Sequence, residues 1–126
     1  ASRPPLASRV VVLGKVTAGQ LETVYERATC FLMPSRAEGF GFPALEAMAR
    51  GIPVAVANAG SLPEVTAGAA LTFDPDDARG LAASVEELVT EPDRRAALIA
   101  QGREVAARYR WNAAADAVWA IIRQVA

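Results

Sequence analysis

One short segment holds the residue types and spacing that could do chemistry. It reads Glu38-Gly-Phe-Gly-Phe-Pro-Ala-Leu-Glu46 and follows a short apolar run, Cys30–Met33. Pro43 suits the first turn of a helix, so a helix is predicted to begin there after a polar, glycine-bearing turn. Glycine lets the backbone approach a ligand closely, and the first helical turn offers unpaired N–H groups and a positive dipole end. This combination favours a phosphate-bearing ligand.

Spacing alone leaves a second interpretation equally open, because glycine before a helix is common in ordinary tight turns. Glu38 and Glu46 favour the ligand site. A carboxylate would repel a phosphate, but it accepts hydrogen bonds from neutral hydroxyls. A sugar nucleotide carries hydroxyls at both ends and a diphosphate between them, so it fits both the helix start and the two acids.

Composition excludes several classes of function. The 126 residues include no histidine, which removes triads that use histidine and most zinc sites. The 13 basic and 14 acidic residues give a net charge of −1, which argues against a nucleic-acid-binding face. The single cysteine, Cys30, leaves no internal disulfide, favours a cytoplasmic protein and is expected to be an inert buried residue. No apolar run is long enough to span a bilayer, and no metal or other cofactor is expected.

Short apolar runs alternate with helical patterns along the chain. The predicted strands are the runs Val10–Leu13, Cys30–Met33, Pro53–Ala57 and Ala70–Phe73. A capping box of Thr17 and Gln20 begins the first predicted helix. The other predicted helices are Pro43–Arg50, a short turn at Leu62–Val65, and three C-terminal helices separated by Pro92 and Trp111. This order predicts a Rossmann-like α/β fold with a parallel sheet of about four strands and flanking helices.

Two other groups of residues have structural interpretations that we favour over functional ones. Asp76 or Asp77 is expected to cap the helix that follows rather than to hold a metal. Trp111 and Trp119 lie at a helix boundary and on an apolar stripe, positions that favour packing over stacking on a base.

The segment from Glu38 to Val54 resembles the E-x7-E signature of family 4 retaining glycosyltransferases, group 1 enzymes with the GT-B fold. The resemblance covers nearly the whole chain and its motifs occur in the family's order, which makes it specific. The other similar segments are the base-side strand and loop at Val12–Val16, the helix Leu21–Ala28, the strand end Phe31–Ser35, the loop Asn58–Val65 and the aromatic turn Tyr109–Trp111.

The resemblance implies a nucleotide-sugar donor, UDP- or GDP-linked, and transfer with retention and without an Asp-x-Asp metal site. It also implies a role for each matching residue. Glu38 would face the transferred sugar at the reacting centre, the backbone of Gly39, Phe40 and Gly41 would line the donor sugar, the Leu45 N–H would approach the diphosphate, Glu46 would hold the ribose hydroxyls, and Val16 would lie beside the base.

The family also uses an Arg-x4-Lys pair upstream of these strands and an N-terminal acceptor-binding domain. Lys15 is the only lysine and matches the base-side loop instead. We therefore expect residues 10–126 to be a donor-binding domain without its first two strands, the C-terminal half of a GT-B enzyme, with little activity alone. Residues 1–9 are interpreted as a linker or a leftover of cloning. An open sheet edge and an exposed face with Trp119 and Ile122 predict a homo-oligomer.

Other functions stay open at this point. The leading alternative is a non-catalytic module that binds a nucleotide sugar or acts as a scaffold. Epimerisation of a nucleotide sugar would normally need histidine, and a dehydrogenase would need Gly-x-Gly-x-x-Gly after the first strand. The full enzyme is expected in the cytoplasm, and a peripheral position at the inner face of the membrane is compatible with the resemblance.

Overall fold

The computed structural model describes residues 8–125, except the side chains of residues 111–113. Most of the segment interpreted as a linker, residues 1–9, therefore lies outside the described residues. Within residues 8–125, no helix is both long and apolar enough to cross a bilayer.

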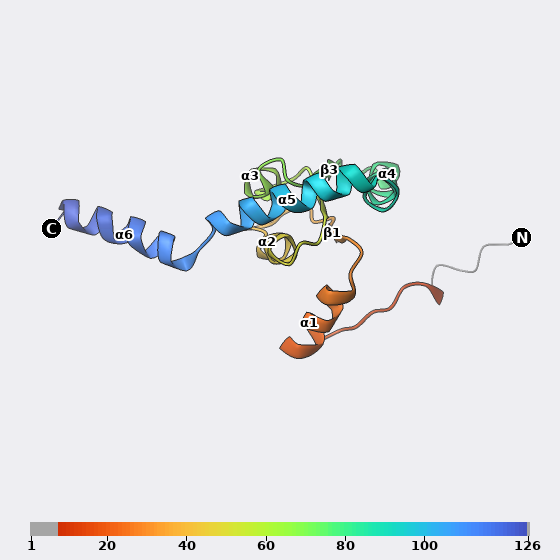
Figure 1. The fold of residues 1–126 in the computed structure, drawn as a ribbon, viewed down its shortest axis with the longest axis horizontal. Coiled ribbons are helices and arrows are strands. Elements are labelled where there is room, and N and C mark those ends of the chain that lie inside the picture. The colour runs from red at the N-terminus through yellow and green to blue at the C-terminus, as the bar shows by residue number, and fades with distance from the viewer. Residues whose placement is uncertain (1–7, 126) are drawn as a thin grey trace, which may run out of the picture.

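A parallel sheet forms the centre of the chain (Figure 1). Its strands, in spatial order, are β1 (Phe31–Met33), β2 (Val54–Ala57) and β3 (Leu71–Phe73). All four residues of β2 are buried, as expected for a parallel strand that is covered on both faces. The predicted α/β fold is confirmed, and each of these strands begins one residue later than the sequence predicts. The described sheet has three strands rather than about four.

The predicted strand Val10–Leu13 is wrong. The segment belongs to no strand of the described sheet, and its four side chains are between 55% and 88% exposed. β-Branched residues fit a pleated surface, but a strand forms only where a neighbour pairs its backbone groups and covers its side chains. Figure 1 shows the segment running out to the side of α1 (Ala18–Arg27), apart from the sheet, so β1 does not serve as that neighbour.

Helices occur where the sequence predicts them, and their caps explain their bounds. The capping box is present: the Gln20 N–H donates to Thr17 Oγ1 at 3.2 Å, and the Thr17 N–H donates to Gln20 Oε1 at 2.9 Å. Asp77, rather than Asp76, caps α4 by accepting from the Arg79 N–H at 3.0 Å. The remaining helices are α2 (Phe42–Ala49), α3 (Leu62–Thr66), α4 (Ala78–Thr90), α5 (Pro92–Arg108) and α6 (Trp111–Val125).

The core lies where α2 and α5 pack together beside the sheet. Met48 of α2 and Leu98 of α5 are each 1% exposed. Gly102 allows this close approach, since a Cβ at that position would lie 3.1 Å from Met48 Cγ. The α2–α5 contact therefore fixes the helix whose first turn carries the candidate site.

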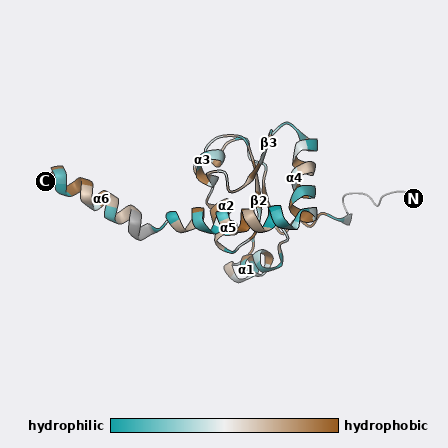
Figure 2. Cartoon of the chain, turned by 45° about the horizontal axis from the view of Figure 1, so that its top comes forward, coloured by the Kyte–Doolittle hydropathy of each residue, from teal (hydrophilic) through white to brown (hydrophobic). Residues whose placement is uncertain are grey.

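The last helix has a different environment. Figures 1 and 2 show α6 extending beyond α5, away from the sheet, with apolar residues along its length. Trp119 is 55% exposed and Ile122 is 44% exposed, so the predicted exposure of these two residues is confirmed and a core position for Trp119 within this chain is wrong. The side chain of Trp111 lies outside the described residues. Self-association through these surfaces stays a prediction.

Leucine-to-alanine substitutions at two helical sites test whether the α2–α5 contact is the centre of the core. Leu98→Ala removes a fully buried side chain and should lower the free energy of unfolding by about 2–5 kcal/mol. Leu21→Ala in α1, where the leucine is 41% exposed, should cost less than about 1 kcal/mol. Urea denaturation followed by circular dichroism measures both values. Equal losses would show that the α2–α5 contact is not the centre of the core.

Candidate functional site

The loop of residues 34–41 joins the carboxyl end of β1 to α2, and a second loop holds it in place. The Ser61 hydroxyl donates to the Phe40 carbonyl oxygen at 2.9 Å and lies 3.1 Å from that of Glu38, the geometry of a shared hydrogen bond. Gly60 also lies close to the loop of residues 34–41, because a Cβ at position 60 would lie 3.2 Å from the Glu38 nitrogen. Both loops follow neighbouring parallel strands, so they meet at the carboxyl edge, where open α/β sheets bind ligands.

The two glycines of the loop have different environments. Gly41 has φ +104° and precedes α2, and a Cβ there would lie 2.8 Å from Leu62 Cδ2. Gly39 lies outside the left-handed region, is exposed, and has no atom within 4 Å of the position of a Cβ. The fold therefore requires glycine at position 41, whereas position 39 leaves its backbone open to a ligand. Spacing alone gave no signal that could separate them.

The loop is open rather than sealed beneath neighbouring helices. Glu38 and Phe40 are partly buried on either side of the exposed Gly39. The Phe40 ring packs edge-on against Tyr109, with ring centroids 5.5 Å apart. The Leu45 side chain is only 6% exposed, so its backbone N–H, and not its side chain, is the group that position 45 can offer to a ligand.

Glu46 lies on an exposed part of α2 and is held by a residue from α1. Its Oε2 accepts a hydrogen bond from the Tyr25 hydroxyl at 3.2 Å. Arg50 lies over the Tyr25 ring, 4.5 Å from its centroid, and donates from Nε and Nη2 to the Glu22 carboxylate at 3.0 and 2.6 Å. The four side chains form one connected group between α1 and α2, which we call the Glu46 network.

Burial and charge shift pKa values within the Glu46 network. Burial is the main cause that raises the pKa of Tyr25, and the Glu46 charge and hydrogen bond add to it. The hydrogen bond from Arg50 lowers the pKa of Glu22, and the same pairing raises the pKa of Arg50. Tyr25 therefore stays protonated at neutral pH and acts as a hydrogen-bond donor.

Val16 is partly buried just before the Thr17 cap of α1. Tyr25 lies in the last turn of the same helix, about 10 Å along its axis from Ala18. The structure thus places Val16 and Glu46 toward opposite ends of α1 rather than in contact.

Sequence reasoning missed Tyr25, Arg50 and Ser61 as site residues. Tyr25 lies within the segment Leu21–Ala28, which was considered only as a helix, although a tyrosine can bury its ring and still present a polar tip. Ser61 lies within the loop Asn58–Val65, which resembles a family motif, but nothing in its spacing predicted a bond to the Glu38–Phe40 backbone.

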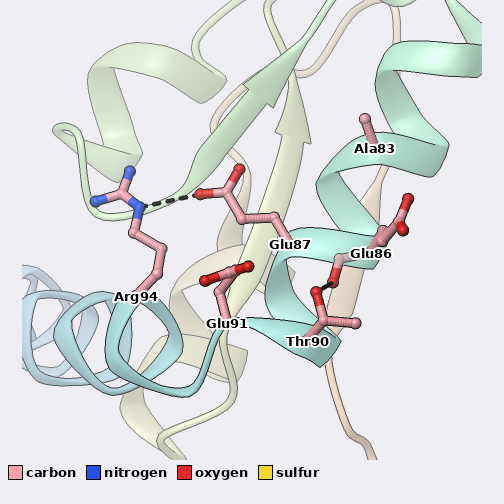
Figure 3. A pocket seen from close by; sticks show the side chains of 6 residues that line it. All are labelled: Ala83, Glu86, Glu87, Thr90, Glu91 and Arg94. Atoms are coloured by element: carbon pink, nitrogen blue, oxygen red, sulfur yellow. Dashed lines mark hydrogen bonds and ion pairs between the residues drawn. The ribbon is translucent and has the colours of Figure 1, made fainter.

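A surface depression on α4 and the start of α5 offers a different chemistry (Figure 3). The side chains of Glu86, Glu87 and Glu91 border it, and its one arginine, Arg94, already donates to Glu87 at 3.1 Å. Three carboxylates around one engaged guanidinium would repel a diphosphate. Within the described part of the chain, no group of three or more Cys, Asp or Glu side chains is arranged to hold a metal ion.

The contrast between the two loop glycines predicts opposite responses to alanine. Gly41→Ala should lower the free energy of unfolding by at least about 1–2 kcal/mol, because alanine strains a positive φ and contacts Leu62 too closely. Gly39→Ala should change it by less than about 0.5 kcal/mol. Chemical denaturation measures both. A Gly41→Ala variant as stable as the wild type would contradict the geometry.

The raised pKa of Tyr25 predicts a pH effect on stability. The folded state binds the tyrosine proton more tightly than the unfolded chain does, so this contribution is complete below the ordinary pKa of about 10 and is lost as pH rises through the folded value. Between about pH 9 and 11, the melting temperature of the wild type should fall more than that of Tyr25→Phe. Parallel curves for the two proteins would show that the hydroxyl is not held as described.

The family match and the related proteins found by comparison agree with one another. The family described as "Glycosyl transferases group 1" matches residues 5–105. The O-antigen chain mannosyltransferase B of Escherichia coli is 38% identical over 100 residues, which cover 79% of this chain and 26% of that protein. A D-inositol 3-phosphate glycosyltransferase of Thermobispora bispora is 43% identical over 98 residues, which cover 76% of this chain and 23% of that protein. The chain thus spans about a quarter of these relatives.

The fold has a solved counterpart. A sucrose-phosphate synthase from Thermosynechococcus elongatus superimposes with a TM-score of 0.83 at 31% identity, over 95% of this chain and 31% of that one. Together with the match over residues 5–105, this likeness shows that the chain belongs to the group 1 glycosyltransferase family and has the Rossmann-like α/β fold of GT-B enzymes.

Proposed function

We propose that this chain is the donor-binding portion of a retaining glycosyltransferase of family 4, which transfers a sugar from a UDP- or GDP-linked donor to an acceptor. One observation carries the proposal. The Ser61 hydroxyl holds the loop of residues 34–41 so that an exposed Gly39 backbone leads directly into the first turn of α2. That arrangement suits a ligand with a phosphate group and neutral hydroxyls on either side of it.

The diphosphate would lie at the start of α2. A helix amino terminus carries a partial positive charge and unpaired N–H groups, and the Leu45 N–H lies within this turn. The backbone of Gly39, Phe40 and Gly41 would line the donor sugar. Glu38 would be the catalytic residue that faces the transferred sugar near the reacting centre, Glu46 would accept from the ribose hydroxyls, and Val16 would lie beside the base.

The chemistry would consist mainly of positioning and charge stabilisation. The bond between the anomeric carbon and the diphosphate oxygen breaks, and negative charge develops on the diphosphate beside the α2 dipole. An oxygen of the departing diphosphate takes the acceptor hydroxyl proton. The acceptor oxygen then bonds to the same face of the sugar, so the configuration is retained.

The remaining parts of the proposed machinery would come from elsewhere in a longer protein. Relatives are about four times as long as the matched region, and the resemblance assigns an Arg-x4-Lys pair and an acceptor-binding domain to segments upstream of it. We therefore propose that this chain binds a donor but transfers little sugar alone.

Gly39 gives the sharpest test of donor binding. Gly39→Ala should fold as the wild type does, but its methyl group should keep the donor from the backbone and weaken binding by about tenfold or more, equivalent to about 1.4 kcal/mol. Isothermal titration with UDP-glucose and GDP-mannose measures the affinity. Gly19→Ala is the matched control, because Gly19 lies on α1 with open space around it.

The results of these titrations distinguish the donor-binding portion of a transferase from the alternatives. Gly39→Ala binding as tightly as Gly19→Ala, or a wild type that binds neither nucleotide sugar, would contradict the proposal. Binding by the chain, with no transfer by any longer protein that contains it, would support a non-catalytic binding module instead.

A further inference from the structure

We propose that Tyr25 is a positioning residue for Glu46. Its hydroxyl holds one carboxylate oxygen, so that the other is presented to the ribose hydroxyls of a nucleotide. The inference rests on the proposed function, because it assigns a purpose to the contact only if Glu46 binds ribose.

Two contacts restrain the Tyr25 ring. It is 6% exposed and stacks on Phe31 of β1, with centroids 6.2 Å apart and an angle of 24° between the planes. The Arg50 guanidinium lies on the ring at 4.5 Å from the centroid. A buried ring that packs against the sheet and an arginine has little freedom, so its hydroxyl is a fixed donor toward Glu46 Oε2 at 3.2 Å.

The Arg50 guanidinium donates its hydrogen bonds to groups other than the Glu46 carboxylate. Two of its nitrogens donate to the Glu22 carboxylate, and Nη1 donates to the Glu46 backbone carbonyl at 3.0 Å. An arginine paired with the Glu46 carboxylate could occupy both oxygens in a bidentate bond. A tyrosine hydroxyl has one proton to give and satisfies only one site on Oε2. The Glu46 network therefore orients the carboxylate and keeps acceptor capacity open for another ligand.

This arrangement predicts a specific readout, the preference for ribose over deoxyribose. A hydroxyl that donates to an oriented carboxylate adds affinity, and a deoxy nucleotide cannot make that bond. The wild type should therefore bind UDP at least about tenfold more tightly than its weaker-binding deoxy analogue, 2′-deoxy-UDP or 3′-deoxy-UDP. A purely structural role of Tyr25 would change the affinity for all three nucleotides by the same factor and leave the ratio unaltered.

The test compares the ratio of dissociation constants in four proteins by isothermal titration. Tyr25→Phe keeps the ring and its stacking but removes the hydroxyl, and it should reduce the preference to about threefold or less. Glu46→Ala should abolish the preference. Tyr109→Phe is the matched control, because it removes the hydroxyl of the other tyrosine in the chain and should keep the wild-type ratio.

The ratios measured in the four proteins separate the positioning role of Tyr25 from the ribose role of Glu46. If Tyr25→Phe keeps the wild-type ratio while Glu46→Ala loses it, the positioning role is overturned and the ribose role of Glu46 stands. If Glu46→Ala keeps the ratio, or the wild type shows no preference or binds none of the nucleotides, the ribose role fails and the inference fails with it. A loss of preference in Tyr109→Phe as large as in Tyr25→Phe would also overturn the positioning role.

Discussion

The hydrogen bond from Ser61 to the backbone of the loop before α2 is the interaction on which the candidate site depends. Loops after neighbouring parallel strands meet at one sheet edge, but meeting alone does not fix their shape. Ser61 provides that restraint by using its hydroxyl on the carbonyl oxygens of Glu38 and Phe40. Because those carbonyls are turned toward the second loop, the exposed Gly39 and the first turn of α2 are left on the open side.

The backbone and the side chains of the site contribute different properties. The start of α2 supplies positive potential without any charged side chain, while the two glutamates supply acceptors at its borders. Each glutamate is anchored through a different neighbour: Glu38 through its backbone to the turn before α3, and Glu46 through its carboxylate to α1. A ligand with a central anion and hydroxyls at both ends matches this distribution, which is why we favour a nucleotide sugar over a simple phosphate.

Local signals predicted most of the fold because they coincide with burial. The runs around Phe31, Val54 and Leu71 became strands, and the capping residues Thr17 and Asp77 began the expected helices. Val10–Leu13 carries an equally strong local signal and failed, because a strand also requires a partner that sequence spacing does not reveal. The same non-local dependence explains why the contacts of the Glu38–Glu46 segment with Tyr25 and Ser61 were not predicted: those bonds join residues 21 to 23 positions apart.

The most direct test of the central claim is amide chemical-shift mapping by NMR while the isotope-labelled chain is titrated with a UDP- or GDP-linked sugar. The account predicts that shifts concentrate in residues 38–46, in Ser61 and around Tyr25, and that they saturate with one dissociation constant. Shifts confined to the acidic face of α4 and α5, or a spectrum unchanged by either nucleotide sugar, would contradict it.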